Sequence, residues 1–139
     1  MGLDMYLFSK EKHPDNTDCS IAKGADGYEI GEREEIAYWR KHNALHALMY
    51  EVYQMNGGTK SFDDFNCVPV RLSIRNLNYI LRRIEDTDLT TTSGFFFGRT
   101  DYMEDYNESP QQEYDIEVIA RAIRVIAVSD KDVYYSSWW

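Results

Sequence analysis

The segment that most constrains the fold is the last six residues, Tyr134-Tyr135-Ser136-Ser137-Trp138-Trp139. Chain ends are usually disordered unless packing holds them, and aromatic side chains bring large apolar areas to cores and binding sites. Two tyrosines and two tryptophans therefore indicate a segment that folds against the rest of the protein. We expect a final strand over residues 133–139, with Trp138 as one wall of a pocket.

The 139-residue chain is 43% hydrophobic and 14% aromatic, which is typical of a folded globular protein. At this length we expect one globular domain over residues 1–139. No apolar run is as long as a bilayer span, and the first residues lack the basic and hydrophobic regions of an export signal. We therefore expect a cytoplasmic protein that does not engage membranes, with Cys19 and Cys67 reduced.

The net charge of −9 is spread unevenly along the chain. Residues 1–35 carry 9 acids and 4 bases, and residues 101–139 carry 9 acids and 3 bases. Residues 36–100 carry 6 acids and 8 bases. Because an acidic surface repels nucleic acid, bulk DNA or RNA binding is disfavoured. The slightly basic middle of the chain is suited to holding a small anion.

Hydrophobic periodicity and turn residues predict the order of the elements. We expect, in order, a strand at residues 3–8, a polar loop at 9–33, a helix at 34–55, an extended piece at 68–70, a helix at 74–85, a strand at 95–97, a helix at 110–128 and the final strand. Strands and helices do not alternate regularly. We therefore predict an α+β fold, with about three helices packed on a small antiparallel or mixed sheet.

The second and third predicted helices carry capping signals. Ser73 precedes one helix, and Ser109 with Pro110 at the first position and Gln112 at the capping-box position precedes the other. Helical spacing predicts two buried stripes, Ile74, Leu77, Leu81 and Ile84 on the first of these helices, and Ile116, Ile119, Ile123 and Ile126 on the second.

The helix predicted at residues 34–55 contains the segment Tyr38-Trp39-Arg40-Lys41-His42-Asn43-Ala44-Leu45-His46. On a helix, Trp39, Asn43 and His46 would share one stripe, with Arg40 beside it. A stacking plane, an amide, an imidazole and a fixed positive charge suit an anionic, ring-containing ligand. The alternative is that Trp39 belongs to the core and that His46 is an interior imidazole with its hydrogen bonds satisfied.

The spacing of His42 and His46 is that of two metal ligands on a helix. Zinc proteases carry glutamate directly after the first histidine, where this chain has Asn43, and the sequence suggests no third ligand. We predict neither a metal nor another cofactor.

A second candidate site is the stretch from Thr90 to Arg99. Hydroxyls followed by a glycine can donate hydrogen bonds to a phosphate or carboxylate, and here Thr91, Thr92 and Ser93 precede Gly94. The spacing is neither that of a Walker loop nor that of a nucleophile elbow. The alternative is a polar turn that leads into a buried strand.

Four motifs of the chain carry a resemblance to a known family: Met-Gly-Leu-Asp-Met-Tyr-Leu at the start, Tyr-Trp-Arg-Lys-His-Asn-Ala-Leu-His, Thr-Thr-Ser-Gly-Phe-Phe-Phe-Gly, and Tyr-Tyr-Ser-Ser-Trp-Trp. With them the chain resembles an uncharacterised family of small proteins from phages, prophages and bacteria. The resemblance implies a phage or mobile-element protein that works inside a bacterial cell. It implies no particular activity.

The leading hypothesis is a protein that binds a small anionic ring compound such as a nucleotide-derived signal. In a phage context such a protein could sequester a host immune signal. One alternative is an acidic stoichiometric inhibitor that mimics nucleic acid and binds a basic host defence protein. The third is a small nucleotide hydrolase with His46 or His42 as general base, although the chain has no strong catalytic motif. The predicted ligand-binding residues are Tyr38, Trp39, Arg40, Asn43, His46, Thr91, Thr92, Ser93, Phe97, Arg99 and Trp138.

Overall fold

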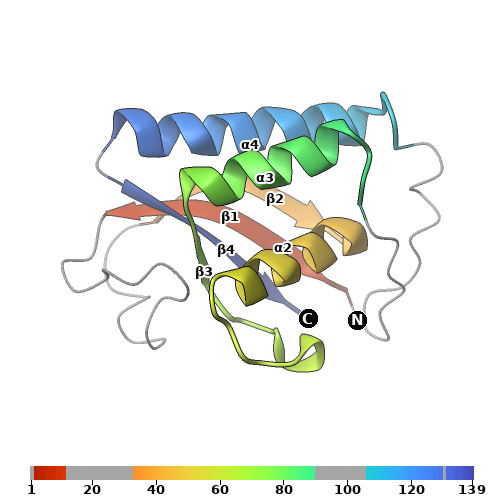
Figure 1. Cartoon of the computed structure of the whole chain (residues 1–139), viewed down its shortest axis with the longest axis vertical. Helices are drawn as coiled ribbons and strands as arrows, with labels where there is room; N and C mark the ends of the chain where they lie inside the picture. The colour runs from red at the N-terminus through yellow and green to blue at the C-terminus, as the bar shows by residue number, and fades with distance from the viewer. Residues whose placement is uncertain (1, 12–32, 90–105, 130) are drawn as a thin grey trace.

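The computed structural model describes residues 2–11, 33–89, 106–129 and 131–139 (Figure 1). Its strands are β1 (Asp4–Glu11), β2 (Arg33–Arg40), β3 (Val70–Leu72) and β4 (Lys131–Trp138). Its helices are α2 (Asn43–Met55), α3 (Ile74–Glu85), α4 (Pro110–Val128) and the short 3₁₀ helix η1 (Phe62–Asp64). The strands form a four-stranded antiparallel sheet in the order β2-β1-β4-β3, which confirms the predicted α+β fold.

The two central strands, β1 and β4, explain why the C-terminal aromatic residues are ordered. The two strands pair along their length, with Leu7 opposite Tyr135 and Phe8 opposite Tyr134. Because successive side chains of a strand point to opposite faces, each pair faces one side of the sheet. Leu7 and Tyr135 belong to the main core, and Phe8 and Tyr134 form a second, smaller cluster. The predicted C-terminal strand is confirmed.

Helices α2, α3 and α4 lie on the same side of the sheet (Figure 1). The main core forms between these helices and the sheet, and Val52 of α2, Ile80 of α3 and Ile119 of α4 are completely buried there. Full burial of an aliphatic side chain of this size stabilises a fold by about 1.5–3 kcal/mol. The apolar side chains buried between the two layers therefore stabilise both the helices and the sheet.

The helix predicted at residues 34–55 is wrong in its first third. Residues 33–40 form strand β2, which pairs with β1 so that Trp39 lies opposite Met5. The long-range pairing and the burial of β-branched and aromatic side chains outweigh the local helical pattern here. The chain then turns at Lys41, whose φ is 57° and whose N–H donates to the Leu3 carbonyl at 2.8 Å. Helix α2 begins at Asn43.

The predicted helices at 74–85 and 110–128 are confirmed, together with their caps. The Ser73 hydroxyl accepts the N–H of Asn76 at 3.0 Å, and the Ser109 hydroxyl accepts the N–H of Gln112 at 3.1 Å. The buried faces differ from the predicted stripes. Ile74 is 37% exposed because it is the first residue of α3.

On α4 the buried face is centred one or two positions from the predicted isoleucines, because this helix packs against both α3 and the sheet. Its buried residues are Gln112, Asp115, Val118, Ile119 and Ala122. Of the predicted stripe, only Ile119 is fully buried, while Ile116, Ile123 and Ile126 are partly buried against the core.

Helix α4 also covers the outer edge of β2. The Tyr114 hydroxyl lies 3.3 Å from both the N–H and the carbonyl of Tyr38, and Arg121 Nη1 lies 3.4 Å from the Ile36 carbonyl. An open strand edge invites pairing with other chains. These side chains occupy part of that edge.

Two predicted segments fall largely outside the described residues. In the predicted polar loop at 9–33, residues 9–11 belong to β1 and residue 33 belongs to β2, and the others are not described. The predicted strand at 95–97 is also outside the described part of the chain.

Candidate functional site

A pocket of about 390 Å³ opens where the turn between β2 and α2 meets the start of α4. Its lining residues come from two segments far apart in the sequence, namely Arg40, Lys41 and His42 from the turn, and Tyr106, Ser109, Pro110 and Gln111 from the start of α4. We call this cavity the turn pocket. Two of its lining residues, Arg40 and Lys41, are exposed cations.

The turn is held in place from both sides. In the β1–β2 register, Arg40 lies opposite Asp4. A Cβ atom at Gly2 would lie only 3.1 Å from Arg40 Nη2, so the guanidinium lies close to the glycine backbone. The positive φ of Lys41 then redirects the chain toward α2. The sheet register and the conformation of Lys41 therefore place Arg40, Lys41 and His42 at one rim of the pocket.

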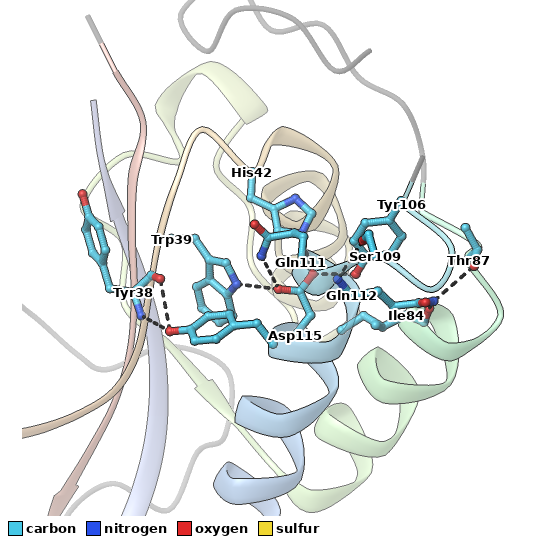
Figure 2. Close-up of polar contacts among 11 residues, drawn as sticks. Tyr38, Trp39, His42, Ile84, Thr87, Tyr106, Ser109, Gln111, Gln112 and Asp115 are labelled. Carbon is cyan, nitrogen blue, oxygen red and sulfur yellow. Dashed lines mark hydrogen bonds and ion pairs between the residues drawn. The ribbon is translucent and has the colours of Figure 1, made fainter. Parts of the chain in front are cut away.

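The start of α4 is fixed by Gln112. Its side-chain amide donates to the Ile84 carbonyl at 2.9 Å and to the Thr87 hydroxyl at 3.2 Å (Figure 2). Its carbonyl accepts the N–H of Glu108 at 2.6 Å. These bonds connect the N-terminus of α4 to the C-terminal end of α3. The positive end of the α4 dipole consequently lies at the turn pocket.

Beneath the pocket lies a carboxylate, Asp115, that is completely buried. Oδ1 accepts from Trp39 Nε1 at 2.7 Å and from Gln111 Nε2 at 2.8 Å. Oδ2 lies 2.5 Å from the Tyr106 hydroxyl and 2.7 Å from His42 Nε2. Figure 2 shows these side chains gathered around Asp115. We call the five residues the Asp115 network.

The network fixes the tautomer of His42. An ionised carboxylate can only accept hydrogen bonds, so the imidazole nitrogen facing it, Nε2, must carry the proton and donate. This assignment follows from the bonding pattern. Four donors also compensate much of the free-energy cost of burying the Asp115 charge. His42 is only 3% exposed, yet it lines the turn pocket.

The charges at the pocket rim favour an anion. Arg40 and Lys41 contribute two exposed cations, and the α4 N-terminus adds a partial positive charge. In the first turn of α4, Pro110 has no N–H, and the N–H of Gln112 donates to the Ser109 hydroxyl. The N–H of Gln111 is therefore the donor in this turn that has no acceptor within the helix. The rim is thus locally positive on a chain of net charge −9.

A second cavity, of about 370 Å³, lies between β3, the start of α3 and the end of α4. Two of its cations already have acidic partners, since Arg71 lies 3.3 Å from Asp132 and Lys131 lies 3.3 Å from Glu34. No comparable ion pair within the described residues occupies the cations of the turn pocket. For this reason we regard the turn pocket as the candidate site.

Of the residues predicted to bind a ligand, Arg40 lines the turn pocket and Trp39 supports it from below. Trp39 is 3% exposed and its Nε1 donates to Asp115, so its ring is part of the structure beneath the pocket. Because residues 33–40 are a strand, Trp39 and Asn43 do not share a helical stripe. Asn43 is completely buried at the start of α2.

His46 lies in an aromatic box away from the turn pocket. The rings of Phe65 and Trp139 lie 5.2 Å from its imidazole, the ring of Phe62 lies 5.5 Å away, and its Nδ1 is 2.6 Å from the Tyr135 hydroxyl. Burial lowers the pKa of His46 to about 3, so the imidazole is neutral. Burial also raises the pKa of Tyr135 well above its ordinary value. His46, on α2, and His42, which precedes the helix, thus have different surroundings.

Tyr38 and Trp138 belong to the sheet face opposite the main core. Tyr38 is 40% exposed, and its hydroxyl donates to Asp4 at 2.5 Å, a bond that raises the Tyr38 pKa. Trp138 is 61% exposed, whereas its neighbour Trp139 packs against the core. Neither Tyr38 nor Trp138 lines the turn pocket. Thr91, Thr92, Ser93, Phe97 and Arg99 lie outside the described residues.

Sequence reasoning missed the acceptor that organises the site. Asp115 is 73 residues from His42 and 76 from Trp39, so no local motif connects them. One signal was present, because Asp115 stands on the same helical face as Ile119 and Ala122, where an apolar residue is expected. An acid on a buried face requires donors from elsewhere in the fold.

Three further observations concern metal ligands, membrane spans and similarity to known proteins. Among the residues described, no three His, Cys, Asp or Glu side chains gather as metal ligands would. In the same part of the chain, every helix is too short or too polar to cross a membrane. Comparison with protein-family models, with curated proteins and with solved structures gives no match to this chain.

Proposed function

We propose that the protein binds a small anionic ligand in the turn pocket, and that the ligand is a ring compound such as a nucleotide-derived signal. The observation that carries the proposal is the meeting of Arg40, Lys41 and the α4 N-terminus at one cavity. Each of these groups attracts negative charge, and they come from separate parts of the sequence. The fold brings them together on a protein that is otherwise acidic.

The size and walls of the pocket suit such a ligand. Small-molecule sites commonly measure about 300–1,000 Å³, and the turn pocket, at about 390 Å³, falls in the lower part of that range. Pro110 offers exposed apolar surface for a ring, while the cations hold the anionic group. Hydrogen bonds to charged groups each contribute about 1.5–3 kcal/mol.

The proposal includes a cellular setting. The sequence resembles small proteins of phages, prophages and bacteria, and this resemblance supports a role in the cytoplasm of a bacterial host. There, a protein that binds a nucleotide-derived signal without releasing it would sequester that signal from a host defence system.

A ligand panel tests the proposal directly. We would measure thermal shifts and calorimetric Kd values for mononucleotides, cyclic nucleotides and cyclic dinucleotides. The double variant Arg40→Ala/Lys41→Ala should weaken binding by about 100-fold, since it removes two charge-assisted contacts. The matched control is Lys60→Ala/Arg124→Ala, which removes two exposed cations that do not line the turn pocket.

Two results would contradict the proposal. One is the absence of binding by any member of the panel at millimolar concentration. The other is a ligand whose affinity falls equally in the site variant and in the control, because that would indicate a general charge effect. A salt-sensitive complex with a basic host protein, unaffected by the site variant, would instead favour the acidic inhibitor, for which the net charge of −9 is the supporting observation.

A further inference from the structure

We propose that the ligand of the turn pocket is a dinucleotide, and that its second nucleoside lies on the outer face of the sheet, stacked on Trp138. The inference rests on the proposed function, because it requires a phosphate to bind beside Arg40 and Lys41. It adds a second binding surface, a narrower class of ligand and an aromatic residue that determines specificity.

The outer face of the sheet, opposite helices α2, α3 and α4, carries exposed aromatic side chains at one end. Tyr6 and Tyr38 lie opposite each other in the β1–β2 register, and their ring centroids are 5.4 Å apart. Trp138 belongs to the same face, because Ser137 beside it is buried on the core side and successive side chains of a strand alternate. Tyr38 is 40% exposed and Trp138 is 61% exposed. Figure 2 shows the Tyr38 ring pointing away from Asp115 and α4.

Three groups on this face form one row across the sheet. The register places Arg40 of β2 opposite Asp4 of β1, and Asp4 opposite Trp138 of β4. Neighbouring strands are about 4.8 Å apart, so the row extends over about 10 Å. A guanidinium, a carboxylate and an indole thus follow one another in the order that suits the phosphate, the ribose hydroxyls and the base of a nucleotide. We call these three residues the outer row.

Arg40 connects the outer row to the turn pocket. It lines the pocket, yet it alternates with the core-facing Trp39, so it belongs to the face of β2 that carries Tyr38. Its guanidinium lies beside the start of β1, close to Gly2. Within the described residues, no ion pair engages this guanidinium. A phosphodiester at Arg40 can therefore link a nucleoside in the pocket to a nucleoside over the sheet.

Asp4 determines the direction in which the ligand lies. Its carboxylate repels a phosphate, so the negative group is favoured at the Arg40 end of the row and a neutral nucleoside over the middle. Oδ1 of Asp4 accepts a hydrogen bond from the Tyr38 hydroxyl at 2.5 Å, which orients the carboxylate. The same bond is the main cause of the raised pKa of Tyr38, so the hydroxyl remains a donor at neutral pH. The other lone pairs of the carboxylate can accept from ribose hydroxyls, as acidic residues do in dinucleotide-binding folds.

Trp138 supplies the stacking surface for the second base. Among the described residues no ring stacks on its indole, whereas the Trp139 ring next to it packs 5.2 Å from His46. Pairing of β4 with β1 along its length holds the backbone of Trp138 in place before a ligand arrives, which lowers the entropic cost of binding. Because every base has a π face, stacking tolerates different bases. The outer row therefore selects for a second base without selecting its identity.

The test compares dinucleotides with mononucleotides by isothermal titration calorimetry. The probes are cyclic di-AMP, cyclic di-GMP and the linear forms pApA and pGpG, with AMP and GMP as single-base references. The wild type should bind at least one dinucleotide about 5- to 150-fold more tightly than the matching mononucleotide, which is the effect of one stacked base. Trp138→Ala should remove this advantage and leave the Kd of the mononucleotide unchanged.

Matched variants separate stacking from a general apolar contact. Trp138→Tyr keeps an aromatic ring and should retain most of the advantage, whereas Trp138→Leu keeps an apolar side chain and should lose it. Met55→Ala is the control, because Met55 is a 57% exposed residue of α2 that does not line the turn pocket. It should bind both classes of nucleotide as the wild type does. Circular dichroism should show the wild-type fold in each variant, since the substituted side chains are exposed.

The outcomes distinguish the two proposals. If mononucleotides and dinucleotides bind equally tightly and Arg40→Ala/Lys41→Ala weakens both, the turn pocket stands as the site and the outer row has no role. If Trp138→Leu binds dinucleotides as tightly as the wild type, stacking is refuted. If affinity continues to rise with the length of a single-stranded oligonucleotide, the ligand is a nucleic acid and the dinucleotide is overturned. If no nucleotide binds, both proposals fail together.

Discussion

The buried imidazole of His46 should make the protein sensitive to acid, and His46→Gln should remove most of that sensitivity. In the folded protein the pKa of His46 is about 3, against 6.5 for a free histidine, and burial is the cause. As the pH falls, the unfolded chain binds the proton first. The stability associated with neutral His46 is therefore complete above pH 6.5 and is lost as the pH falls toward 3.

The magnitude follows from the two pKa values. One pH unit within this interval changes the free energy of unfolding by about 1.4 kcal/mol per titrating group. Between about pH 7 and about pH 4.5, a group whose pKa moves from 6.5 to about 3 accounts for a loss of about 2.5 kcal/mol. That loss is a large part of the stability of an ordinary domain, which is about 5–15 kcal/mol.

The assay compares urea unfolding of the wild type and His46→Gln across this pH interval, followed by circular dichroism. Carboxylates that titrate over the same range are common to both proteins, so their contributions cancel in the difference. The stability advantage of the wild type should shrink by about 2.5 kcal/mol on acidification. Tyr135→Phe is the control, because it keeps the imidazole buried and should retain the wild-type pH dependence. Parallel pH profiles for the wild type and His46→Gln would refute the reasoning.

Three other substitutions test separate parts of the structure. Asp115→Asn should lower the free energy of unfolding by about 3 kcal/mol, because one partner of a buried polar network is lost, and chemical denaturation would measure it. Ser73→Ala should cost about 1 kcal/mol through loss of the α3 cap, and the midpoint of thermal unfolding would report it. Tyr114→Phe removes the hydroxyl from the edge of β2 and should promote self-association, which sedimentation velocity would detect as a concentration-dependent species.

The sequence was sufficient to predict the elements whose signals are local. Caps and helical periodicity identified α3 and α4, and the aromatic composition of the C-terminus identified β4. The same reasoning failed for β2, because the sequence spacing of Trp39 and His46 also fits one stripe of a helix. What decides the conformation of residues 33–40 is pairing with β1, which local periodicity does not report.

The candidate site was only partly predictable for a related reason. Arg40 could be identified as a cation next to aromatic residues, and His42 as an imidazole beside it. The groups that give them a function, Tyr106, Gln111 and Asp115, join them through contacts between residues 64 to 76 positions apart. Such contacts depend on how α4 crosses the sheet. A sequence pattern gives the face of a helix and leaves its crossing undetermined.

The Asp115 network itself gives a reason to regard the turn pocket as functional. A buried carboxylate with four donors is costly to desolvate, and replacing such a network with apolar side chains of similar volume is often neutral or stabilising. The combined variant His42→Phe/Asp115→Leu/Tyr106→Phe should therefore retain most of the wild-type stability, because few buried polar groups are left unpaired. It should lose ligand binding, because the wall of the turn pocket becomes apolar. If this variant kept both stability and ligand binding, the polar groups would have no role at the site. If it unfolded while Asp115→Asn did not, the network would be a requirement of the fold.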